Sequence, residues 1–170
     1  MDGARPLSRR QLLFGRHAAV PAVVAFRPPW ARPEPDFASA CTRCDACVQA
    51  CPQDVLVRGE GGLPQFDAQA GECTFCGECA MACDSGAFLP ALDPPWTLSA
   101  QVADTCLSAR GVVCASCRDT CPATAIHVPP AARGIAVIDA GACTGCGACI
   151  GSCPVDALSL YHAPAMEATA

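Results

Sequence analysis

The stretch from Cys41 to Pro52 reads CTRCDACVQACP, with its cysteines spaced C-x-x-C-x-x-C-x-x-x-C. Cysteines two or three residues apart converge on one point, which suits a metal centre and rarely suits pairwise disulfide bridges. One loop can wrap three such thiolates, while a fourth, placed further along, points away from that loop. The proline that follows suits a chain leaving the loop, because it lacks an N–H and fixes φ.

All 16 cysteines of the 170-residue chain fall into four groups of this kind. The groups that begin at Cys41, Cys73 and Cys143 match the spacing in full. The group that begins at Cys106 reads CLSARGVVCASCRDTC, with seven residues before Cys114. The candidate ligands are Cys41, Cys44, Cys47, Cys51, Cys73, Cys76, Cys79, Cys83, Cys106, Cys114, Cys117, Cys121, Cys143, Cys146, Cys149 and Cys153.

The full spacing is typical of [4Fe–4S] ligation in bacterial ferredoxins. A cubane cluster has four iron corners, and each needs one thiolate. Zinc is the alternative, and its sites are typically built from two C-x-x-C pairs separated by a longer spacer. A contiguous run of three cysteines with a distant fourth fits the cubane better. The remaining large side chains are few, with six Phe, two Trp and one Tyr, so the thin core needs such a staple.

The chain repeats with a period of 70 residues. The seven cysteines from Cys44 to Cys83 each have a counterpart 70 positions later, and GEC at 71–73 corresponds to GAC at 141–143. We therefore expect an α+β fold, a tandem duplication of a bacterial two-[4Fe–4S] ferredoxin unit that carries four clusters. In two-cluster ferredoxins the last cysteine of one motif ligates the other cluster. The expected sets are Cys41, Cys44, Cys47 with Cys83; Cys73, Cys76, Cys79 with Cys51; Cys143, Cys146, Cys149 with Cys121; and Cys106, Cys114, Cys117 with Cys153.

Cys106 breaks the repeat, because the counterpart of Cys41 would be position 111, which is Gly111. Two interpretations follow. Either Cys106 reaches its iron through a longer loop bent at Gly111, or it is a structural thiol and the chain holds three clusters. We favour ligation, since a free thiol beside a cluster would be an oxidation hazard and glycine lets the loop fold back.

Short apolar runs flank a Gly-rich stretch after Cys51 and a Pro-rich stretch after Cys121, and both predict β-hairpins. Short helices are expected at 47–51 and 79–83. The expected divisions are a basic, partly disordered arm at 1–32, a two-cluster unit at 33–90, a linker at 91–105, a second unit at 106–163 and a tail at 164–170. The expected core comprises Val55, Leu56, Val57, Phe66, Phe88 and Leu89, then Ile126, Val128, Ile135, Val137, Ile138, Leu158 and Leu160.

The charges are unevenly distributed. The net charge is −5, yet residues 1–32 carry six Arg and one acid, and the remainder of the chain is acidic. An acidic body argues against a nucleic-acid partner. Arg9 and Arg10 before an apolar run are typical of a twin-arginine export signal, but Arg16, His17 and Pro21 interrupt that run. No stretch is long enough for membrane insertion.

Nothing indicates catalysis or a small-molecule substrate. His17, His127 and His162 are scattered, and no Rossmann or phosphate-binding glycine pattern is present. The chain is therefore expected to be an electron-transfer or accessory protein rather than an enzyme.

The SRR-x-L-L-x-GR start, the RPPW turn, CTRCDAC, the long first gap of the third motif and the closing C-x-GCGAC-x-x-SCPV together resemble the NapF-type ferredoxins. The resemblance covers nearly the whole chain. One departure is that Cys83 is followed by Asp84 rather than proline, which leaves the ligand chemistry unchanged.

This resemblance implies an accessory iron–sulfur protein of the periplasmic nitrate reductase system. It would act in the cytoplasm, where it docks on the reductase's catalytic subunit before export and assists maturation by supplying electrons or clusters. The paired arginines would then not be a working export signal; a periplasmic location is the alternative. The alternative function is a general polyferredoxin that relays electrons between redox enzymes.

Overall fold

The computed structural model describes residues 26–91, 95–130 and 134–163. In chain order the elements are α2 (Asp36–Ala40), α3 (Ala46–Gln49), β1 (Leu56–Arg58), the 3-10 helix η1 (Glu60–Gly62), β2 (Pro64–Phe66), α4 (Glu78–Met81), β3 (Leu98–Val102), the 3-10 helix η2 (Ser108–Arg110), α5 (Ser116–Asp119), β4 (Ile126–His127), β5 (Val137–Ile138) and β6 (Leu158–His162). Short helices and two-stranded sheets make this a mixed helix and strand fold. We call residues 26–91 the first half and residues 95–163 the second half.

Each half contains one of the two expected hairpins. Strands β1 and β2 pair antiparallel with Leu56 opposite Phe66, and β4 and β5 pair with Ile126 opposite Ile138. The expected helices are also present: α3 and α4 each begin one residue before a cysteine of the predicted stretch, Cys47 and Cys79. The hairpins place the last cysteine of one motif beside the first cysteines of the next.

A third sheet occupies the stretch that was expected to be a linker. Strand β3 covers five residues of it and pairs antiparallel with β6, with Leu98 opposite His162 and Val102 opposite Leu158. The stretch 91–105, which was expected to link the two halves, thus includes a strand that the sequence did not predict. Prolines just before this strand obscured its apolar pattern.

The matching place in the first half is taken by residues 26–31. Phe26 bridges to Phe66, and Ala31 bridges to Phe88. The end of the expected basic arm is therefore part of the folded first half. The backbone N–H of Arg32, the last residue of that arm, donates to the carbonyl oxygen of Ala87 at 3.0 Å. The rest of that arm, including the paired arginines, and the tail from 164 lie outside the described residues.

The apolar core is divided between the halves but continuous. Val55, Leu56 and Phe66 are buried in the first half as expected, and Ile126 and Leu158 are buried in the second. Ala68 and Leu160 pack against both clusters of buried residues. Val137 was expected in the core but is 55% exposed. Its neighbours Ala136 and Ile138 face inward, so strand alternation turns Val137 to the surface.

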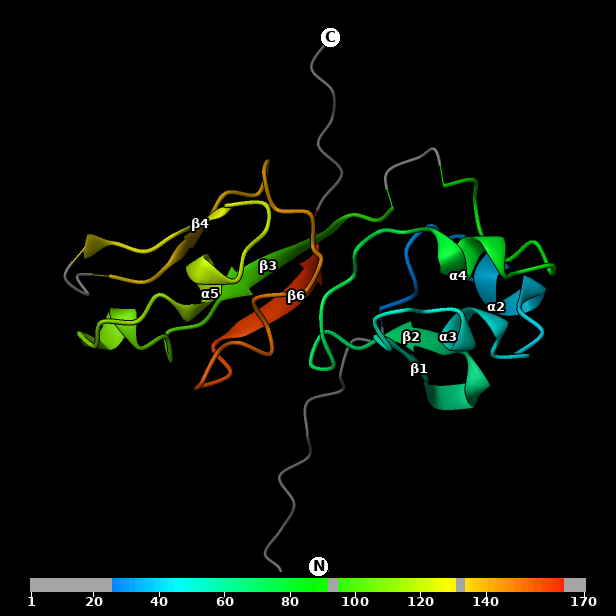
Figure 1. Ribbon diagram of the computed structural model, residues 1–170, viewed down its shortest axis with the longest axis horizontal. Helices are drawn as coiled ribbons and strands as arrows, with labels where there is room; N and C mark the ends of the chain where they lie inside the picture. Colours follow the sequence, from blue (N-terminus) through cyan, green and yellow to red (C-terminus); the bar gives the residue numbers. More distant parts are fainter. Residues whose placement is uncertain (1–25, 92–94, 131–133, 164–170) are drawn as a thin grey trace, which may run out of the picture.

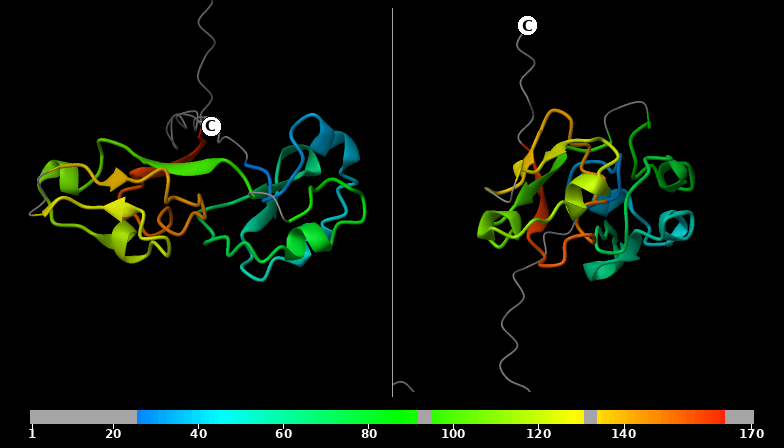
Figure 2. Two further views of the ribbon diagram at one scale, coloured as in Figure 1. Left: turned by 90° about the horizontal axis from the view of Figure 1, so that it is seen from above. Right: turned by 60° about the vertical axis from the view of Figure 1, so that its left-hand side comes forward.

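The molecule is elongated, and its two halves lie side by side along the long axis (Figures 1 and 2). Strands β3 and β6 run beside the hairpin β4–β5; β3 leads away from the first half, and the antiparallel β6 returns toward it. Within the described part of the chain, no helix has the length and apolar character needed to cross a bilayer.

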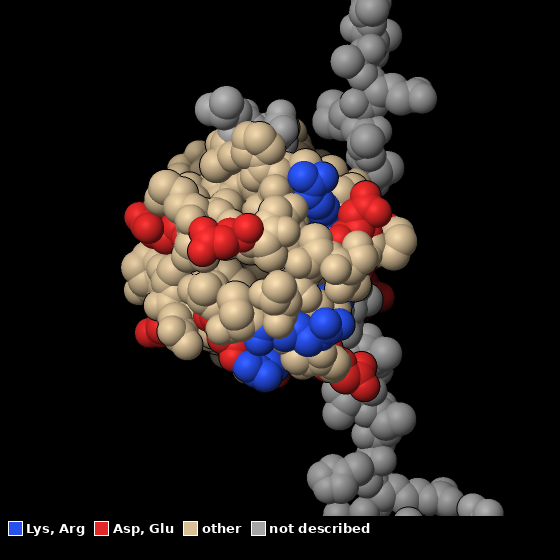
Figure 3. Space-filling view, turned by 90° about the vertical axis from the view of Figure 1, so that its right-hand side faces the viewer, with Lys and Arg blue, Asp and Glu red and all other residues tan. Residues whose placement is uncertain are grey.

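On the end of the first half that Figure 3 shows, basic and acidic side chains are interspersed. Arg58 pairs with Asp45, and Arg27 pairs with Glu34 at 2.7 Å. Such exposed pairs contribute about 0–1 kcal/mol each. Within each of these pairs the two charges neutralise one another locally.

Candidate iron–sulfur sites

The inner site of the first half is a pocket that gathers Cys51 with Cys73, Cys76 and Cys79. Val55 and Leu56 line the same pocket. This is the crossed set expected from the two-cluster pattern, because Cys51 comes from the preceding motif. Cys79 is buried and Cys76 is exposed, so the four thiols and the apolar wall form a sulfur-rich pocket that opens to solvent at one ligand, an environment that suits a cubane.

The inner site of the second half repeats this arrangement. Its pocket gathers Cys121 with Cys143, Cys146 and Cys149. Ala100, Ile126 and Leu160 provide the apolar lining. The two inner pockets are thus lined in the same way, by three cysteines of one motif, the last cysteine of the preceding motif and apolar side chains.

The outer site of the second half contains the irregular cysteine. One pocket is lined by Cys106, Cys114, Cys117 and Cys153, with about 370 Å³ of empty space. Cys106 is therefore brought to the same pocket as the other three thiols of its expected set, despite the longer gap. The chain turns back through η2 and then through Gly111, whose φ of +82° lies in the left-handed region that glycine adopts without strain.

The outer site of the first half involves Cys41, Cys44, Cys47 and Cys83. Cys41 and Cys83 pack against the buried cluster of Phe37, Leu63 and Ala87. Cys47 is buried, whereas Cys44 is exposed. Three of the four expected ligands thus lie within the protein and the fourth lies at its surface.

A repeated backbone conformation shapes the loops of the three complete motifs. In each motif the residues just before and just after the second cysteine have positive φ. These are Arg43 and Asp45, Phe75 and Gly77, and Gly145 and Gly147. Left-handed residues curl the chain tightly, so the first three cysteines of a motif face one centre. In the third motif the described residues near Cys114 lack this pair, and Gly111 provides the turn instead.

All four motifs share a second turn, after the last cysteine. Three positions beyond it, Asp54, Gly86, Thr124 and Asp156 have positive φ. In the second half this turn aims backbone N–H groups at sulfur: Ala125 donates to Cys121 Sγ at 3.4 Å, and Ala157 donates to Cys153 Sγ at 3.2 Å. N–H···S bonds of this kind stabilise a thiolate ligand and tune the cluster potential.

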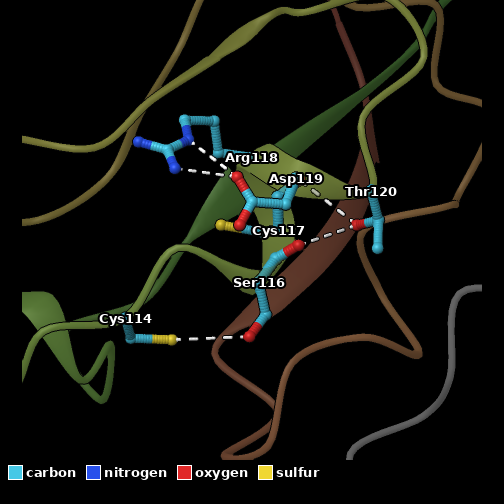
Figure 4. A network of polar contacts seen from close by, with 6 residues as sticks. All are labelled: Cys114, Ser116, Cys117, Arg118, Asp119 and Thr120. Carbon is cyan, nitrogen blue, oxygen red and sulfur yellow. Dashed lines mark hydrogen bonds and ion pairs between the residues drawn. The ribbon is translucent and has the colours of Figure 1, made fainter.

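Cys83, which lacks the following proline, has a different partner. Its Sγ lies 3.3 Å from the hydroxyl oxygen of Ser85. In Figure 4 the Cys114 side chain points toward the Ser116 hydroxyl, 3.8 Å away, at the start of α5. Thr120 closes that helix by donating to the carbonyl of Ser116 at 3.0 Å. Serine hydroxyls therefore accompany a thiol in each outer site.

Burial perturbs the free thiols strongly. Burial, together with the neighbouring cysteines, raises the pKa of Cys47 and Cys73 to about 11 and that of Cys79 and Cys149 to about 12. Ionising any of these thiols is costly until a cation compensates the charge. Iron supplies that compensation, so the buried thiols suit a cluster better than they suit a free thiolate.

The pKa values of Cys106 and Cys44 are lowered, in contrast to those of the buried thiols. Burial alone would raise the pKa of Cys106, but the backbone N–H groups of Ala136, Ala109 and Ser108 together lower it. The pKa of Cys44 is lowered chiefly by the backbone N–H of Ala46. Three amides around the Cys106 sulfur favour its thiolate, which is the form that binds iron.

Among the residues that the structure describes, no three Cys, His, Asp or Glu side chains converge closely enough to hold one metal ion. In a cubane the four thiolates bind four different irons, so they surround the cluster instead of meeting at a point. The thiol-lined pockets fit this group in donor type, donor number and apolar lining.

Two features of the sites were not predicted. Gly147 permits close contact with the first half, as described below, and Trp96 packs between Phe66 and Phe75 with ring centroids 5.0 and 5.5 Å away. Trp96 directly follows two prolines, and this local sequence does not indicate which loops its ring contacts.

Two segments of the chain match known families of iron–sulfur domains. Residues 40–87 match a 4Fe–4S dicluster domain, and residues 136–159 match a 4Fe–4S binding domain. The chain therefore contains two 4Fe–4S ferredoxin-type domains and binds [4Fe–4S] clusters.

Named relatives extend over most of the chain. The ferredoxin-type protein NapF of Escherichia coli is 42% identical over 157 residues, covering 91% of this chain and 94% of its own length. The NapF of Haemophilus influenzae is 37% identical, covering 91% and 93%. The methylamine utilization ferredoxin-type protein MauM of Methylophilus methylotrophus is 34% identical, covering 84% and 72%. By this similarity, its cysteine motifs and its two domains, the chain belongs to the NapF family of ferredoxin-type proteins.

Proposed function

We propose that this protein is a tandemly duplicated polyferredoxin with four [4Fe–4S] clusters, one at each site described above. The observation that carries the count is the pocket shared by Cys106, Cys114, Cys117 and Cys153. A bound cluster supplies one-electron storage. The chain's own apolar residues limit the access of water to the cluster. The N–H groups of Ala125 and Ala157 donate to the ligand sulfurs of Cys121 and Cys153 and stabilise their negative charge.

We further propose that it acts in the cytoplasm on the catalytic subunit of a periplasmic nitrate reductase before that subunit is exported. Support for this comes from membership of the NapF family and from what the resemblance of the motif pattern to that family implies. The protein would dock on the subunit and assist its maturation by supplying electrons or clusters.

Exposed apolar side chains beside an outer site support docking. Val112 is 49% exposed and Val113 is 83% exposed, and both directly precede Cys114. Apolar residues beside a terminal redox site suit a transient protein contact that brings two centres close. The acidic body favours a basic docking face on the partner.

Anaerobic pull-down with the reductase catalytic subunit tests this proposal. Wild type is expected to bind, and Val113→Asp is expected to bind more weakly at unchanged iron content. Val137→Asp, an equally apolar exposed position on β5, serves as the matched control. Absence of binding by iron-loaded wild type would contradict the nitrate reductase partner.

The alternative function is a general electron relay between redox enzymes. The similarity to MauM, whose name places it in methylamine utilization, favours a scaffold that serves more than one redox system.

Fractionation of cells tests the proposed cytoplasmic location. A shortened form in the periplasm would contradict it.

A further inference from the structure

The loops that carry the two inner sites touch each other. The backbone N–H of Cys73 donates to the carbonyl oxygen of Cys146 at 2.8 Å. Cys73 lines the inner pocket of the first half, and Cys146 lines the inner pocket of the second. The two halves are therefore in contact through the chain segments that hold candidate ligands.

Gly147 allows this close approach. A Cβ atom at Gly147 would lie 2.9 Å from Ala68 Cβ and 2.9 Å from Phe66 Cζ, two residues of the first half. Any side chain at Gly147 would push the second-half loop away from the first half.

Trp96 fixes the two loops together. Its Nε1–H donates to the carbonyl oxygen of Thr144, at 2.9 Å, in the second-half loop. Its ring packs against Phe75 in the first-half loop and against Phe66 at the end of the first hairpin. One side chain thus contacts both inner-site loops, and it is not itself a candidate ligand.

The packing orders the four sites in a row. Cys47 of the outer site and Cys79 of the inner site lie in one buried cluster of the first half. Cys149 of the inner site and Cys117 of the outer site belong to the buried cluster of the second half. With the inner loops in contact, these contacts give the order outer, inner, inner, outer.

We propose that the two halves form one continuous electron path, that the path crosses between them at the contact of Cys73 with Cys146, and that Trp96 is the residue that positions this crossing. One electron leaves the inner site of one half and is gained by the inner site of the other, and no bond forms or breaks. A low-potential one-electron donor and a one-electron acceptor act at the ends. This inference rests on the proposed clusters but not on the proposed reductase partner.

Anomalous diffraction at the iron edge of wild-type crystals tests the order without any substitution. The expected map has four iron groups in one row, with the inner pair no farther apart than the two groups within a half. A map in which the inner pair is the widest gap would overturn the proposal.

EPR of the fully reduced protein tests the role of Trp96. Trp96→Leu removes the Thr144 bond and the ring contacts, and it is expected to reduce spin–spin coupling between the inner sites while iron content stays at the wild-type level. Trp96→Phe retains a ring and is expected to fall between the two. Wild-type coupling in an iron-replete Trp96→Leu protein would refute the positioning role; if that variant loses iron, the wild-type anomalous map decides. Binding to the reductase subunit is not involved, so the two proposals fail separately.

Discussion

Replacing Gly147 by alanine should loosen the contact between the halves. Gly147 has φ of +87°, and an L-residue in the left-handed region costs about 1–2 kcal/mol. The added Cβ would also meet Ala68 and Phe66 at 2.9 Å, and overpacking of this kind costs about 1–3 kcal/mol more. Gly61→Ala is the matched control, because Gly61 has φ of +66° and nothing within 4 Å of the new Cβ.

The two variants share the backbone cost, so their difference isolates the junction. A difference of about 1–3 kcal/mol corresponds to roughly 2–12 °C in melting temperature for a chain of this size. Loss of the clusters' visible absorbance, followed anaerobically at one fixed heating rate, measures it, because cluster loss is irreversible. If both variants lose their clusters at the same temperature, the close packing at Gly147 is refuted.

Three further predictions concern the rest of the scaffold. Phe37→Ala removes a fully buried ring that stacks edge-on against Phe88 at 5.8 Å; it should destabilise the protein by about 3–5 kcal/mol, seen as earlier cluster loss on heating, and a change below about 1 kcal/mol would contradict its core role. Arg118→Ala breaks an exposed pair with Asp119 and should change stability by less than about 1 kcal/mol in the same assay. Removing iron with a chelator should unfold both halves, which hydrogen exchange would report as lost protection in all three sheets; retained protection would show that the thin core is stable without iron.

Cysteine spacing predicted most of the sites because ligand geometry is local. Positive φ around the second cysteine and three residues past the last one follows from the wrap of a short loop around one centre, and the motif specifies that wrap. The crossed pairing of Cys51 with the next motif also followed from the spacing. The hairpins were predictable for the same reason, since a Gly-rich or Pro-rich turn lies between short apolar runs.

Long-range contacts were not predictable. Strand β3 forms because β6, some 60 positions later, supplies its hydrogen-bonding partner. The sequence around Leu98 alone does not predict this pairing. Val137 was misplaced because a two-residue strand gives too short an alternation to choose its inward face. The Cys73–Cys146 contact depends on how two separately recognisable units dock, and no motif encodes that docking.

The proposed central feature is that Cys106 is a ligand and that the chain therefore carries four clusters. Iron and acid-labile sulfide, measured on anaerobically purified protein beside Cys106→Ala, test this most directly. We predict four [4Fe–4S] clusters per chain in wild type and a loss confined to the outer site of the second half in the variant. Equal iron and sulfide contents in the two proteins would contradict this prediction. Cys106 would then be a structural thiol, and the chain would hold three clusters.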